Sequence, residues 1–153
     1  RDRSPSRGLG DVYKRQEDIE KESEFYKKCF QMIAVSEKQK DKNILLDELL
    51  EHEDSEIITT KLITPAGKQN GQGDMIELVK IVSHVEHLRI PSSIYNTGMM
   101  HIAIGVEDID RVIDLIAQNG GRSKTNIVTH ANGNRFAFAI DPEGNWLELI
   151  ERH

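Results

Sequence analysis

The chain has 153 residues, a length that suits one domain with a sizeable hydrophobic core and is short for two ordinary domains. Its net charge of −6 argues against a nucleic-acid partner, because phosphates attract an excess of Lys and Arg, and no apolar run reaches the roughly 18 to 20 residues of a membrane span. Cys29 is the single cysteine, so no intramolecular disulfide can form, and we expect a cytoplasmic protein.

Residues 1–16 differ in composition from the rest of the chain. They contain five Lys or Arg and two Asp or Glu, which leaves 15 basic and 24 acidic residues in the remainder. The stretch "DVYKRQ" also lacks the alternation of apolar side chains that is typical of a buried strand. We therefore expect residues 1–16 to be a foreign or disordered leader, similar to the junction sequences that errors in gene-fragment assembly leave behind.

The next residues predict a helix, followed by strands and a second short helix. In the helix at 18–30, Asp18 is the expected N-cap, and Ile19, Tyr26, Cys29 and Phe30 share one face. The segments that follow are a strand at 32–37, a helix at 41–54 with a leucine stripe (Leu45, Leu46, Leu49, Leu50), a strand at 56–64, a glycine-rich turn at 65–73 and a returning strand at 74–81.

The second half of the chain predicts the same kinds of element. A connector at 82–98 precedes a strand at 99–106 and a helix at 108–121 that ends at Gly-Gly. Residues 125–152 predict several strands, separated by the turn sequences "ANGN" and "DPEGN".

The two halves therefore indicate an internal repeat. "EDIEKESEFY" at 17–26 lies 90 residues before "EDIDRVIDLI" at 107–116, and a strand-rich stretch that ends in "IEL" or "LEL" follows each copy. The second copy has a strand before its helix, and the same offset places the first copy's strand at residues 11–18. Because that octapeptide does not look like a buried strand, we expect the first strand to be missing or replaced.

Three strands each carry one side chain that can bind a metal ion. Alternation places Glu77, His101 and Glu148 on strand faces whose other residues are small, apolar or aromatic. A carboxylate buried in such surroundings is costly unless it is paired, hydrogen-bonded or bound to a metal. Two carboxylates and an imidazole suit a divalent ion with open coordination positions. The spacing alone leaves a second interpretation open, in which both Glu face solvent and His101 is a core histidine.

"MHIAIGVEDID" and "FAFAIDPEGNWLELIE" resemble the second half of vicinal oxygen chelate proteins, the superfamily of glyoxalases, extradiol dioxygenases and bleomycin-resistance proteins. "EFYKKCF" and "TPAGKQNGQGDMIELVKI" resemble its first half, and "LLDELL" resembles a helix that some members insert. The resemblance implies an α+β fold in which two βαβββ modules form a curled mixed sheet around a metal-binding cavity. It covers one domain at 17–152, with module one at 17–81, the connector at 82–98 and module two at 99–152.

The same resemblance implies how the site would be built. Glu77, His101 and Glu148 would bind one divalent ion (Zn, Ni, Co, Mn or Fe), and Glu148, with Glu77 second, would transfer the proton. A fourth ligand, usually His, would come from the opening strand, where the register points to Asp11 and the family pattern fails. Trp146 and Arg135 are candidates for the substrate pocket, although core packing suits Trp146 equally well and the place of Arg135 in the sequence favours a solvated position at the rim.

The function that the resemblance implies is a metal-dependent lyase or isomerase of glyoxalase type. It would act on a small carbonyl compound, a thioester or a glutathione adduct through a metal-stabilised enolate, as a homodimer. Two alternatives stay open: a metal-free protein that binds a small molecule such as a drug, and an Fe(II) extradiol dioxygenase.

Overall fold

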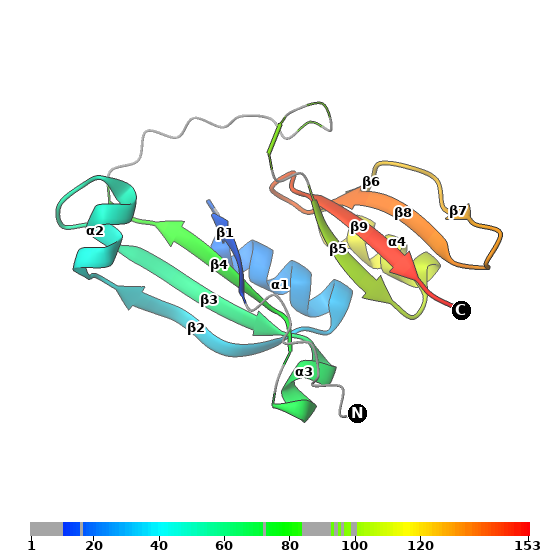
Figure 1. Cartoon of the computed structure of the whole chain (residues 1–153), viewed down its shortest axis with the longest axis horizontal. Helices are drawn as coiled ribbons and strands as arrows, with labels where there is room; N and C mark the ends of the chain where they lie inside the picture. The colour runs from blue at the N-terminus through cyan, green and yellow to red at the C-terminus, as the bar shows by residue number, and fades with distance from the viewer. Residues whose placement is uncertain are drawn as a thin grey trace, which may run out of the picture. The chain divides into compact units, whose positions relative to one another are not determined.

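The computed structural model describes residues 11–15, 17–71, 73–83, 93, 95, 97–98 and 101–153, with side chains from residue 17 onward (Figure 1). The chain divides into two compact units, one formed by Arg1–Lys27 and Gln31–Glu86 and the other by Lys28–Phe30 and His87–His153. Residues 1–10, most of the expected connector at 82–98, and Met99 and Met100 lie outside the described residues. No helix in the described part of the chain combines the length and apolar character that a membrane crossing requires.

The first unit contains a four-stranded sheet in the order β1–β4–β3–β2. β1 runs parallel to β4, and the β2–β3 and β3–β4 pairs are antiparallel. The predicted hairpin between the strands at 56–64 and 74–81 is therefore confirmed. The elements of this part of the chain are β1 (Asp11–Arg15), α1 (Ile19–Phe30), β2 (Ile33–Asp41), α2 (Ile44–Leu50), β3 (Ile57–Ile63), α3 (Pro65–Asn70) and β4 (Met75–Ile81).

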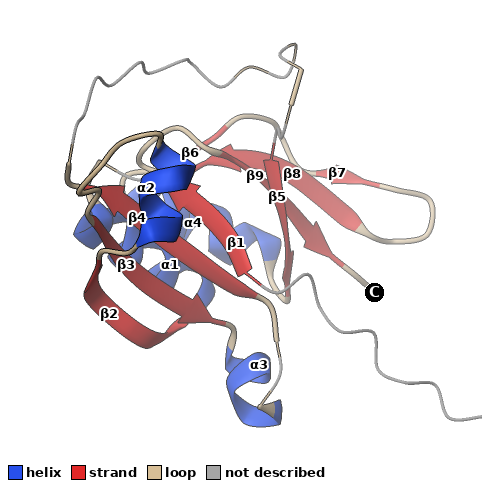
Figure 2. Cartoon of the chain, turned by 60° about the vertical axis from the view of Figure 1, so that its left-hand side comes forward, coloured by secondary structure: helices blue, strands red, loops and turns tan. Residues whose placement is uncertain are grey.

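Two helices lie on opposite faces of this sheet (Figures 1 and 2). α1 begins where predicted, because the Asp18 carboxylate accepts a hydrogen bond from the Lys21 N–H at 3.0 Å. α2 begins in the same way at Asn43, whose side-chain oxygen accepts from the Leu46 N–H at 3.0 Å. α2 packs on the sheet face opposite α1, where Leu46 clusters with Ile57 and Val79.

The structure corrects three expectations for the first half of the chain. We expected the first strand to be missing or replaced, within a foreign or disordered leader. A strand, β1, occupies residues 11–15 and pairs with β4, so the strand is not missing, and the foreign origin of residues 1–16 stays a prediction. Backbone pairing with β4 forms this strand without an apolar side-chain pattern. The segment at 65–73 is not only a turn, because Thr64 caps the short helix α3 with Pro65 in its first turn. The leucine stripe of α2 divides, since Leu46 is buried whereas Leu45 and Leu49 are exposed.

The second unit contains a five-stranded sheet in the order β5–β9–β8–β6, with β7 also paired to β8. β5 runs parallel to β9, and the remaining pairs are antiparallel. α4 begins at the cap residue Asp108, whose carboxylate accepts from the Arg111 N–H at 3.0 Å. The elements are β5 (His101–Val106), α4 (Ile109–Gln118), β6 (Arg122–Ser123), β7 (Val128–Thr129), β8 (Arg135–Ile140) and β9 (Trp146–Glu151).

The two units repeat one another, as the sequence predicts. β1 and β5 begin 90 residues apart, at Asp11 and His101, and each runs parallel to the last strand of its unit. Asp11 pairs with Met75 on β4, and His101 pairs with Trp146 on β9. The α+β class and the mixed sheets are thus confirmed, and each unit contributes an open sheet.

Candidate functional site

The last strand of the second unit has one face in the core and one face open. Leu147, Leu149 and Glu151 are buried, whereas Trp146, Glu148 and Ile150 alternate with them and are partly exposed. Ala137 and Ala139 on β8 are also buried, and their small side chains leave room for α4 against this face. The face that carries Glu148 is therefore the one away from the helix, as strand alternation predicts.

His101 and Glu148 meet on this open face. The Nε2 atom of His101 lies 3.1 Å from the Oε2 atom of Glu148, and the two side chains are 37% and 24% exposed. β5 and β9 bring them together, since His101 pairs with Trp146 and Ala103 with Glu148. The structure thus brings two of the three predicted metal-binding residues into contact, in a partly exposed position rather than in the core.

Aromatic side chains surround this pair. Phe138 lies directly opposite Glu148 on β8, and its ring meets the His101 ring edge to face at 5.4 Å. The rings of Phe138 and Trp146 are 6.0 Å apart, and the Lys124 ammonium lies 5.0 Å from the Trp146 ring centre. Trp146 therefore shares the face of Glu148, as expected. Phe138 was not recognised from the sequence, although the alternation of aromatic residues with alanine in "RFAFAI" places it on this face.

Glu77 lies on β4 of the first unit and has a partner of its own. Its Oε2 atom is 3.5 Å from the Nζ atom of Lys61, which pairs with it across β3 and β4. The Glu77 side chain is 17% exposed. β4 pairs in parallel with β1, and β9 pairs in parallel with β5. Glu77 therefore occupies the same position along β4 as Glu148 occupies along β9.

The opening strand occupies the register that the repeat predicts. Asp11 pairs with Met75 two residues before Glu77, as His101 pairs with Trp146 two residues before Glu148. Only the backbone of Asp11 is described, so its suggested ligand role stays a prediction. Among the side chains that the structure describes, no three His, Cys, Asp or Glu residues group together as a metal centre.

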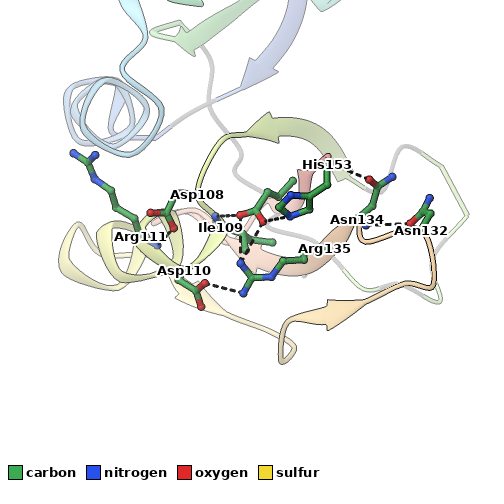
Figure 3. A network of polar contacts seen from close by, with 9 residues as sticks. Asp108, Ile109, Asp110, Arg111, Asn132, Asn134, Arg135 and His153 are labelled. Atoms are coloured by element: carbon green, nitrogen blue, oxygen red, sulfur yellow. Dashed lines mark hydrogen bonds and ion pairs between the residues drawn. The ribbon is translucent and has the colours of Figure 1, made fainter.

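Arg135 belongs to a polar network on the helix side of β8 (Figure 3). Its guanidinium donates to the Asp110 carboxylate at 2.7 Å and to both oxygens of Glu151 at 3.3 and 3.4 Å. Arg135 alternates with Phe136 and Phe138, so it lies on the face opposite Glu148. The structure therefore places Arg135 in a network that supports α4, and its suggested pocket role lacks a supporting contact.

Glu151 is the centre of that network and was not recognised from the sequence. Its carboxylate is buried at the start of α4 and accepts a hydrogen bond from the Ile109 N–H at 2.7 Å, while His153 Nε2 lies 2.8 Å from its other oxygen. The Ile109 N–H, with Arg135 and His153, lowers the pKa of Glu151 below its ordinary value, against the opposing effect of burial. Strand alternation places Glu151 on the same face of β9 as Leu147 and Leu149, and its burial could have been predicted from this pattern.

Comparison with known proteins identifies the family. The model of the Glyoxalase/Bleomycin resistance protein/Dioxygenase superfamily matches residues 9–149, nearly the whole chain. The chain belongs to this superfamily. The resemblance inferred from its sequence motifs, to the vicinal oxygen chelate proteins, is thereby confirmed.

Solved structures agree with this glyoxalase-superfamily assignment at the level of the fold. A glyoxalase family protein from Bacillus cereus has a TM-score of 0.82 and 16% identity, with 94% of this chain and 92% of that chain covered. A glyoxalase I variant from Zea mays has a TM-score of 0.60 and 22% identity, with 93% of this chain but 44% of that chain covered. No curated protein sequence matches the chain.

Superfamily members commonly bind a divalent metal, and the donor chemistry of this chain fits such an ion. An imidazole nitrogen and a carboxylate oxygen that lie 3.1 Å apart on an accessible face are ligand types that Zn, Ni, Co, Mn and Fe accept. Glu77 holds the equivalent register position in the first unit. By donor type, His101 and Glu148 therefore suit a divalent metal.

Proposed function

We propose that this superfamily member is a divalent-metal-dependent lyase or isomerase of glyoxalase type. The observation that carries the proposal is the contact of 3.1 Å between His101 Nε2 and Glu148 Oε2 on a partly exposed, aromatic-flanked sheet face. The proposed substrate is a small carbonyl compound, a thioester or a glutathione adduct. The proposed assembly is a homodimer.

Glu77, His101 and Glu148 are the proposed metal-binding residues. A divalent ion held by them would supply Lewis-acid chemistry, which stabilises negative charge as it develops on substrate oxygens. Asp11 is a weaker candidate for a fourth ligand, on register alone.

The chain's own groups supply proton transfer and substrate contacts. Glu148 is the proposed proton carrier, because its partly exposed carboxylate lies between Ala103 and Phe138 on the open face. Glu77 is the second candidate for this role. Phe138 and Trp146 are the proposed contacts for the apolar part of the substrate, since their partly exposed rings flank the His101–Glu148 pair.

Metal titration of single-residue variants tests the ligand assignment. We expect H101A, E148Q and E77Q each to weaken binding of Zn²⁺ or Ni²⁺ by roughly 100-fold or more in isothermal titration calorimetry, since each loses a direct ligand. H52A and E107Q remove the same kinds of side chain from exposed positions and should bind as the wild type does. Wild-type affinity in H101A and E148Q would contradict the proposed site.

Turnover tests the reaction class. The metal-loaded protein should convert glutathione adducts of small carbonyl compounds or other thioesters, and E148Q should lower kcat by roughly 10² to 10⁴, the range that general acid–base groups contribute. An E148Q variant that binds metal weakly yet keeps wild-type kcat at saturating metal would remove Glu148 from the proton-transfer role.

A metal-free binding protein is the second candidate function. The aromatic side chains Phe136, Phe138 and Trp146 share the open face, and aromatic surfaces of this kind bind planar or apolar ligands. Metal content of the purified protein separates the classes. Stoichiometric Zn, Ni, Co or Mn supports the lyase or isomerase, Fe supports dioxygenase chemistry, and binding of small aromatic molecules by metal-free protein supports the second candidate.

A further inference from the structure

Three asparagines of the chain are each followed by glycine: Asn70, Asn119 and Asn132. Glycine has no Cβ, so its backbone nitrogen can approach the side-chain carbonyl carbon of the preceding asparagine more closely than the nitrogen of a larger residue can. This approach is the first step of deamidation, which converts an asparagine into aspartate or isoaspartate. The surroundings of the three sites differ, and they decide which asparagine reacts in the folded protein.

Hydrogen bonds restrain Asn119 and Asn132. The side-chain amide of Asn119 donates to the Leu115 carbonyl at 2.8 Å, and its main-chain N–H donates to the same carbonyl at 3.0 Å. The side-chain oxygen of Asn132 accepts from the Asn134 N–H at 3.1 Å. The N–H of the glycine after Asn132, which would attack at that site, donates to the His130 carbonyl at 2.9 Å. Both sites must therefore break hydrogen bonds before they can react.

Asn70 has no comparable restraint. It is the last residue of α3, its side chain is exposed, and no hydrogen bond within the described part of the chain involves that side chain. Gly71 follows it in the left-handed conformation, with φ of +66°, and a Cβ added there would have no neighbour within 4 Å. α3 has six residues, and the ends of so short a helix fray, so the backbone around Asn70 can adopt the geometry that the reaction needs.

We propose that Asn70 is the site at which the folded protein deamidates. The main-chain nitrogen of Gly71 attacks the side-chain carbonyl carbon of Asn70 and forms a C–N bond. The side-chain nitrogen of Asn70 leaves as ammonia and takes the proton that the Gly71 N–H gives up, so the product is a five-membered succinimide. Water then opens one of the two succinimide carbonyl groups, which gives aspartate or isoaspartate. No group is oxidised or reduced, and water is the only co-reactant.

The new carboxylate would lie at the C-terminal end of α3, which connects β3 and β4 (Figure 2). A helix C-terminus carries partial negative charge, because its last carbonyl groups lack partners within the helix, so a further negative charge there is unfavourable. Isoaspartate also inserts an additional carbon atom into the backbone, directly before the left-handed Gly71. Deamidation of Asn70 should therefore loosen α3.

Peptide mapping by mass spectrometry of the full chain, aged in mildly alkaline buffer, tests the proposal. We expect the peptide that contains Asn70 to deamidate roughly tenfold faster, or more, than those that contain Asn119 and Asn132, because the hydrogen bonds at the latter two raise the barrier. In concentrated urea the three rates should converge, since the three sites then share the same chemistry. Equal rates in the folded protein, or a faster reaction at Asn119 or Asn132, would overturn the proposal.

Two variants separate the reaction from its consequence. N70Q has a longer side chain that cannot form the five-membered ring, so the acidic form that isoelectric focusing detects should appear roughly tenfold more slowly than in the wild type. N70D carries the negative charge from the start and should lower the Tm by roughly 1 to 4 °C relative to N70Q. An acidic form that appears in N70Q at the wild-type rate would refute Asn70 as the site, and equal Tm values of N70D and N70Q would refute the effect on α3.

Discussion

Two carboxylates on β9, three residues apart, have opposite surroundings. Glu148 is partly exposed beside His101, whereas Glu151 is buried at the first turn of α4 and bonded to the Ile109 N–H and Arg135. A helix N-terminus favours a negative charge, because its first N–H groups lack partners within the helix. Glu151 is thus a structural carboxylate, whereas Glu148 is the carboxylate that we propose for proton transfer.

We expect E151Q to lower the Tm at pH 7 by roughly 5 °C, since a neutral amide replaces hydrogen bonds to a charged group. The pKa of Glu151 is lowered by folding, so its contribution is complete above the ordinary carboxylate pKa of roughly 4.3 and is lost as the pH falls through the folded value. The Tm difference between wild type and E151Q should therefore shrink between pH 5 and pH 3, measured by scanning calorimetry.

The exposed carboxylate Asp114 on α4 provides the control for this prediction. D114N should leave the Tm within about 1 °C of the wild type at each pH, as surface substitutions usually do. A constant Tm difference between wild type and E151Q over this pH range would contradict the role assigned to the Glu151 charge.

At the scale of elements, α2 shows how tertiary packing selects among similar side chains. Its four leucines all suit the apolar side of a helix, but the helix is only seven residues long and one side of it reaches the sheet. Leu46 and Leu50 fall on that side, whereas Leu45 and Leu49 are 71% and 64% exposed. Sequence periodicity identified the helix, and contact with β3 and β4 decided which leucines form the core.

The neighbouring residues Leu46 and Leu45 therefore form a matched pair of test positions. L46A should lower the free energy of unfolding by about 2 to 4 kcal/mol, because it opens a cavity against Ile57 and Val79. L45A should change it by less than about 0.5 kcal/mol. Urea titration measures both values, and equal losses in the two variants would contradict the packing of α2 described above.

β1 is the element for which the sequence was misleading. A parallel strand on the β1–β4 edge needs backbone hydrogen bonds from Asp11–Arg15, and these form whatever the side-chain pattern. Deletion of residues 1–16 should expose the edge of β4, so that the protein associates in size-exclusion chromatography and its Tm falls. Deletion of residues 1–9 keeps β1 and is the control; equal behaviour of the two truncated chains would contradict this role.

At the scale of the whole molecule, a metal that binds the folded chain should stabilise it. Free Zn²⁺ or Ni²⁺ at about 100 times its Kd adds about 2.7 kcal/mol, which corresponds to a rise in Tm of roughly 5 to 10 °C. A combined E77Q, H101A and E148Q variant should show no such rise in differential scanning fluorimetry, and EDTA should return the wild type to its metal-free Tm. An equal rise in the triple variant would place the metal elsewhere.

The sequence by itself determined the repeat, the helix capped at Asp18, the helix that begins at Asp108, the hairpin of β3 and β4, and the alternation that sets Glu148 opposite the leucines of β9. These features follow from local periodicity and capping, which neighbouring residues encode. Only the tertiary structure decided that His101 meets Glu148, that Lys61 pairs with Glu77, that Glu151 is buried with Arg135, and that residues 11–15 form a strand. Each of these depends on which strand or helix lies next to another, and sheet pairing brings together residues that are far apart in the chain.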